Sequence, residues 1–190
     1  HHLIQIQPIT WTNNMNLEQF KQLLDLLLNA NLTDERGFIH IMLMAKETIN
    51  IKLEKLQQIA ETAITEAGDI PSFGEDDKGV ALTNMYSEHR ATIDSIHREI
   101  PKLGPEFNEL EEKFTRLLHK LHNELTGGTS NGVNANERGR LAGEFAEIGA
   151  RVDVKIKRVT RSSMTLQALQ EEVPKSESTS YTSAYLDLIR

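Results

Sequence analysis

The chain has 190 residues, of which 38% are hydrophobic, 26% charged and only 5% aromatic, the balance of a folded protein with an aliphatic core. Its formal net charge of −7 repels phosphate groups and therefore argues against nucleic acid as a partner. The absence of cysteine excludes disulfide bonds and zinc sites with cysteine ligands.

The first predicted element is a short helix that follows an N-terminal arm. Residues 1–15 mix apolar and polar positions, so we expect an arm that packs Trp11 onto the rest of the chain. Asn16 has the side chain of an N-cap, and Gln19 lies three residues later, as in a capping box. A leucine-rich face continues from this cap and predicts a helix that ends near Asn29–Asn31.

The second predicted helix is the longest uninterrupted pattern in the sequence. It covers residues 33–67 with no proline and a single glycine, Gly37, and Gly68 is a natural end. At about 1.5 Å per residue, such a helix would be roughly 50 Å long. Its apolar residues recur at spacings of three and four: Phe38, Met42, Ala45, Ile49, Leu53, Leu56, Ala60, Ala63 and Ala67.

Two further helices are predicted, with a pair of prolines between them. A glycine-rich loop at residues 68–79 precedes the first, which has a heptad pattern of Leu82, Tyr86, His89, Ile93, Ile96, Ile100 and Leu103. Pro101 is expected to end or kink that helix, because proline lacks the amide donor and clashes with the preceding turn. Pro105 suits the first turn of the next helix, which ends at the loop of residues 127–136.

The last predicted helix begins between Asn134 and Arg140 and extends as far as Glu172. The low-complexity residues that follow predict a flexible C-terminal tail over residues 174–190. Residues 16–173 are therefore interpreted as one all-α domain. The expected architecture is an antiparallel bundle of four long helices plus a shorter N-terminal helix, with coiled-coil-like packing.

The second predicted helix carries an apolar segment from Phe38 to Ala45, interrupted only by His40. Burial within the bundle or in an oligomer is the expected explanation, which makes the segment a candidate surface for a protein partner or for self-association. Membrane engagement is an alternative, although the segment is too short to span a bilayer. The candidate contact residues are Phe38, Ile39, Ile41, Met42 and Met44.

A basic segment stands out from the acidic chain. Residues 134–170 hold seven Lys/Arg and four Asp/Glu, a net +3 that leaves −10 for the rest of a chain of net charge −7. Solvation or pairing with acidic residues of neighbouring helices, for example Glu106, Glu109, Glu111 and Glu112, is the expected explanation. The alternative is that this face binds a phosphoinositide headgroup, nucleic acid or an acidic partner surface. The candidate residues of this basic face are Arg151, Lys155, Lys157, Arg158 and Arg161.

Arg138 and Arg140 lie where the polar loop meets the last helix. An arginine inserted from such a place accelerates GTP hydrolysis in some regulators of small GTPases, so regulation of a small GTPase is a further alternative function. Capping of the loop, or solvation, is the expected explanation for both side chains.

Histidines are the only candidate metal ligands with suggestive spacing. His119 and His122 lie one turn apart, and Asp94 and His97 have the spacing of the carboxylate–histidine element of di-iron sites. However, Arg116 stands where a second such element would need a carboxylate. We therefore predict no metal site and interpret His119 and His122 as surface histidines.

No phosphate loop, nucleophile elbow, zinc-protease motif or dinucleotide fingerprint occurs, so the sequence predicts no catalytic or cofactor-binding residue and no enzyme. The predicted function is a non-enzymatic helical-bundle module that binds a protein partner or self-associates. The main alternative is a bacterial secreted effector or toxin component that acts at host membranes. Neither a span of about 20 apolar residues nor a signal peptide is evident, so we expect a soluble protein that is cytoplasmic or secreted without a cleavable signal.

Overall fold

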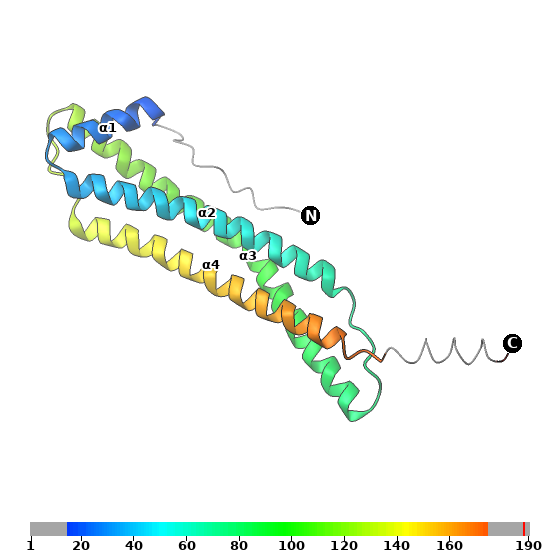
Figure 1. Cartoon of the computed structure of the whole chain (residues 1–190). Helices are drawn as coiled ribbons and strands as arrows, with labels where there is room; N and C mark the ends of the chain where they lie inside the picture. The colour runs from blue at the N-terminus through cyan, green and yellow to red at the C-terminus, as the bar shows by residue number, and fades with distance from the viewer. Residues whose placement is uncertain (1–14, 175–187, 189–190) are drawn as a thin grey trace. The chain divides into compact units, whose positions relative to one another are not determined.

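The computed structural model describes residues 15–174 and residue 188. These residues form four helices that pack against one another, with no strand among them: α1 (Leu17–Asn29), α2 (Thr33–Ala67), α3 (Asp77–Thr126) and α4 (Ala135–Gln170) (Figure 1). The all-helical prediction is confirmed. Apart from residues 15, 174 and 188, the predicted N-terminal arm and C-terminal tail lie outside the described residues.

The chain divides into two compact units, and α2, α3 and α4 contribute to both. Unit 1 comprises residues up to 57 together with residues 99–155. Unit 2 comprises residues 58–98 together with those from 156 onward. Each unit therefore draws on segments that are far apart in the sequence.

Local signals set the first helix as predicted. The Asn16 side chain accepts a hydrogen bond from the amide of Gln19 (2.9 Å), and the Gln19 side chain accepts one from the amide of Asn16 (3.1 Å). This capping box satisfies two amides that a helix start leaves without partners. After α1, Asn31 takes a left-handed backbone conformation (φ 60°), which turns the chain into α2.

The predicted break at Pro101–Pro105 is wrong, because α3 continues through both prolines. The two prolines are exposed, whereas an apolar face at spacings of three and four runs across them without interruption. Burial of that face outweighs the cost of about 3 kcal/mol for each interior proline. The described residues therefore form four helices, whereas the sequence predicted four long helices plus a shorter one. The buried residues of this face are Ile100, Leu103, Phe107 and Leu110.

The loop before α3 is shorter than predicted, because α3 begins at Asp77 and includes Gly79. The Asp76 carboxylate accepts a hydrogen bond from the Gly79 amide (2.7 Å), which caps the new helix. A side chain at Gly79 would overlap the backbone carbonyl of Gly74. Glycine is thus needed there because loop and helix backbones approach closely.

Unit 1 has an aromatic core to which three helices contribute. Phe38 of α2 packs edge-on against Phe114 of α3, with ring centroids 6.4 Å apart. Phe145 of α4 packs against both Phe114 (6.3 Å) and Phe107 (6.1 Å). The short α1 reaches α3 through Gln22, whose side-chain oxygen lies 2.8 Å from the ring nitrogen Nε2 of His122.

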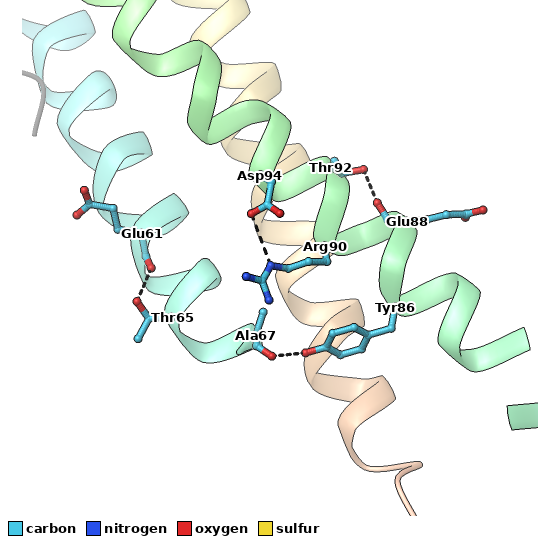
Figure 2. A network of polar contacts seen from close by, with 8 residues as sticks. All are labelled: Glu61, Thr65, Ala67, Tyr86, Glu88, Arg90, Thr92 and Asp94. Carbon is cyan, nitrogen blue, oxygen red and sulfur yellow. Dashed lines mark hydrogen bonds and ion pairs between the residues drawn. The ribbon is translucent and has the colours of Figure 1, made fainter. Parts of the chain in front are cut away.

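Unit 2 is organised around Tyr86, whose side chain is fully buried. Figure 2 shows its hydroxyl donating a hydrogen bond to the carbonyl oxygen of Ala67 at the end of α2. The same hydroxyl accepts a hydrogen bond from the Gln170 side chain of α4 (3.1 Å). Phe73 of the preceding loop lies against the tyrosine ring, with centroids 6.0 Å apart. One tyrosine thus joins all the segments of this unit.

Candidate functional site

The candidate site is an exposed apolar face of α2 within unit 1, which we call the α2 outer face and define as Ile41, Met44, Thr48 and Ile51. The side chains of Ile41, Met44 and Ile51 are 65%, 68% and 59% exposed. Thr48 between them is also exposed. Successive members are three, four and three residues apart, the spacing of a helix face that meets another helix.

The opposite face of the same segment of α2 is buried and holds the helix in place. Because an α-helix has 3.6 residues per turn, residues three or four apart share one face, and neighbours in the sequence can lie on opposite faces. The fixed orientation of α2 keeps the outer face directed to solvent. The buried residues on the inner side are Phe38, Ile39, Met42, Ile49 and Leu53.

The five candidate contact residues predicted from the sequence therefore divide between the two sides of α2. Phe38, Ile39 and Met42 belong to the core, and only Ile41 and Met44 are available to a partner. Ile51, which extends the exposed face by two turns, was missed. Its spacing from Ile41 and Met44 was the signal that could have found it.

Charged side chains flank the α2 outer face. Glu47 and Glu54 lie exposed on one side of it. On the other side Lys52 donates to the Asp153 carboxylate of α4 (3.0 Å), and about a third of the lysine side chain remains exposed. An apolar stripe between charged margins is the pattern of an interface whose flanking charges select orientation.

A buried ion pair fixes α2 against α3 behind this face. The Lys46 ammonium lies 3.1 Å from the Glu111 carboxylate, and the two side chains are only 5% and 16% exposed. Burial raises the pKa of the Glu111 carboxyl above its ordinary value of 4.5, although the charge and hydrogen bond of Lys46 oppose the shift. Desolvation therefore outweighs the attraction of the partner.

Glu111 should titrate above pH 4.5 in the folded protein. A carboxyl whose pKa is higher in the folded state than in the unfolded state binds its proton more tightly in the folded protein. Its contribution to stability is complete at pH values below the pKa of the unfolded state, and it is lost as the pH rises through the pKa of the folded state. NMR titration of the Glu111 side-chain carbon measures the midpoint directly. In Lys46→Met the midpoint should move higher still; a midpoint at or below 4.5 in the unmodified chain would contradict the assignment.

The predicted basic face divides between the two units. In unit 1, Arg151 pairs with Glu106 of α3, one of the four glutamates that the sequence suggested, and Lys155 pairs with Glu99, which was not among them. Glu111 and Glu112 pair instead with Lys46 and Arg116. In unit 2, the side chains of Lys157, Arg158 and Arg161 are exposed and make no ion pair with any residue that the structure describes. Arg151 and Lys155 are thus engaged within the chain.

The two loop arginines lie in the first turns of α4. The side chain of Arg138 is partly buried, and its Nε atom is buried without a hydrogen-bond partner among the described residues. Arg140 is exposed and lines a pocket between α3 and α4. The two arginines therefore do not form one site.

The histidines are not brought together around a common centre. No group of three or more His, Asp or Glu side chains within residues 15–174 has an arrangement that could hold a metal ion. The interpretation of His122 as a surface residue is wrong: it is only 8% exposed, because α1 covers it and Gln22 provides a hydrogen-bond partner. His89 of unit 2 lies 3.1 Å from the Ser162 hydroxyl through its Nδ1 atom.

None of the helices within the described part of the chain combines the length and hydropathy that crossing a lipid bilayer requires. The chain matches no protein-family model, no curated protein and no solved structure. Function must therefore be argued from its own residues.

Proposed function

We propose that the chain is a non-enzymatic interaction module in which the α2 outer face binds a second copy of the same chain. The observation that carries this proposal is the set of three large apolar side chains at heptad spacing on one exposed face. The other exposed large apolar residues of α1, α3 and α4 do not form such a set. They are Leu17 and Leu28 of α1, eleven residues apart, Val80 and Met85 of α3, five apart, and Val154 and Met164 of α4, ten apart.

Charge favours a parallel pairing of the two α2 helices. In a parallel coiled coil, Ile41 and Thr48 would occupy one of the two core positions of the heptad, and Met44 and Ile51 the other. In this register Glu47 of one copy faces Lys52 of its partner. An antiparallel pairing would instead bring like charges together. Since each chain carries a net charge of −7, added salt should strengthen the association by screening the repulsion between copies.

We further propose that the helices of unit 1 form an antiparallel bundle. The order of the contacts supports this arrangement, because Lys113 contacts Glu144 whereas Glu106, earlier in α3, contacts Arg151, later in α4. Such a scaffold would hold α2 rigid, so that binding would cost little conformational entropy.

Sedimentation equilibrium or light scattering over a range of concentrations tests the proposal. The unmodified chain should show a concentration-dependent mass that approaches that of a dimer. Met44→Glu should be monomeric, because the interface would bury an unpaired carboxylate. Met164→Glu is the matched control: it replaces a methionine of α4 with 65% exposure against 68% for Met44, and it should associate like the unmodified chain.

A monomer at every concentration would refute self-association, as would equal effects of the two methionine substitutions. The membrane alternative has its own readout. Flotation with vesicles that contain anionic lipid, if it depended on Met44, would favour membrane engagement over a protein interface.

A further inference from the structure

A second feature of unit 1 is a pocket of about 330 Å³ between α3 and α4. Each helix supplies four residues at the same spacing, i, i+3, i+4 and i+7, which places them on one face. The pocket lies outside the α2 outer face and involves no residue of α2. The lining residues are Lys113, Arg116, Leu117 and Lys120 of α3, and Glu137, Arg140, Leu141 and Glu144 of α4.

The pocket combines an apolar floor with a cationic rim. Leu117 and Leu141, at the i+4 position of each helix, are 8% and 6% exposed. Four cations and two carboxylates surround them, which gives the lining a charge of +2 in a chain of net charge −7. An apolar surface beneath converging polar groups is the usual composition of a small-molecule site.

Three of the four cations are not neutralised by the carboxylates of the pocket. Lys113 is already engaged by Glu144 at 3.5 Å, and Arg116 has only a distant contact of 3.9 Å with the exposed Glu112. Lys120 and Arg140 are exposed and make no ion pair or hydrogen bond with the residues that the structure describes. Three cations therefore remain available to a ligand, opposed by the single carboxylate of Glu137.

We propose that this pocket binds a phosphate monoester with a small apolar or aromatic body. A phosphate monoester carries nearly two negative charges at neutral pH and accepts several charge-assisted hydrogen bonds, which suits two or three converging cations. Arg140 and Arg116 provide planar, bidentate donors for the phosphate, and Lys120 provides a point charge. The ester's carbon part packs on Leu117 and Leu141.

NMR titration of the full chain with phenyl phosphate tests the proposal. The ligand should shift amides of residues 113–120 and 137–144 saturably, and benzenesulfonate, which has a similar ring but a single charge, should bind more weakly. The double variant Lys120→Gln/Arg140→Gln should raise the Kd about 100-fold, roughly tenfold for each charge-assisted hydrogen bond lost. The control Lys157→Gln/Arg161→Gln removes the same charges elsewhere on α4 and should leave the Kd within about twofold.

The proposal is overturned if phenyl phosphate causes no saturable shift, if benzenesulfonate binds equally well, or if both double variants lose affinity alike. Vesicles that contain phosphatidic acid distinguish the source of the phosphate. Flotation that depends on Lys120 and Arg140 assigns a lipid headgroup, and solution binding without flotation assigns a soluble ester. Met44→Glu should bind phenyl phosphate normally, so the pocket and self-association can fail separately.

Discussion

Glu111→Leu should lower the free energy of unfolding by about 3–5 kcal/mol, because it leaves the Lys46 ammonium buried without its partner. Lys46→Met should cost less, since Glu111, whose pKa burial already raises, can take up a proton and become neutral. The double variant Lys46→Met/Glu111→Leu should be about as stable as the unmodified chain or more stable, because it removes both desolvated charges.

Urea unfolding followed by far-UV circular dichroism gives the change in the free energy of unfolding for each of the three variants. Together with the unmodified chain, these variants complete a double-mutant cycle. The expected signature is an interaction free energy of opposite sign to the two single costs. Equal costs for the two single variants, with a double variant as unstable as their sum, would show that the side chains contribute through packing rather than as an ion pair.

Phe114→Ala should also cost about 3–5 kcal/mol, the range for truncating a buried phenylalanine. Its ring is 1% exposed and contacts Phe38 of α2 and Phe145 of α4, so the cavity would open where three helices of unit 1 meet. Close packing on all sides leaves little room for the surrounding side chains to collapse into it.

Phe114→Leu is the matched comparison, because it keeps an apolar side chain of moderate size and should cost clearly less than the alanine variant. Thermal unfolding of the two variants, measured in parallel, separates loss of volume from loss of aromatic contact. If both variants lost the same stability, the edge-on ring contacts rather than the filled volume would account for the role of Phe114.

The sequence predicted those elements that local signals determine. The capping box of Asn16 and Gln19, the bounds of α2 and the start of α4 depend on residues a few positions apart, and the structure confirms them. The continuity of α3 could not be predicted in this way. Its prolines are strong local stop signals, and only burial against other segments of the chain overrides them.

The candidate site could be predicted only in part, because local signals do not show which residues are buried against other segments of the chain. An all-apolar segment does not reveal which side of a helix faces inward, so Phe38 and Ile41 could not be separated until the core was known. The burial of His122 could not be predicted from its neighbours either, because its hydrogen-bond partner, Gln22, lies 100 residues earlier in the sequence. The pocket requires the register of α3 against α4, which no pattern within either helix contains, although each helix shows the same spacing of its four lining residues.

The division into two units has a consequence for how the chain is made. The units are interleaved: residues 58–98 of unit 2 come before residues 99–155 of unit 1, and the remainder of unit 2 comes last. During synthesis, unit 1 is complete only after residue 155 has emerged, and unit 2 later still. No single contiguous fragment contains all of one unit without part of the other, so cutting the gene at any one codon cannot yield the two units as separate products.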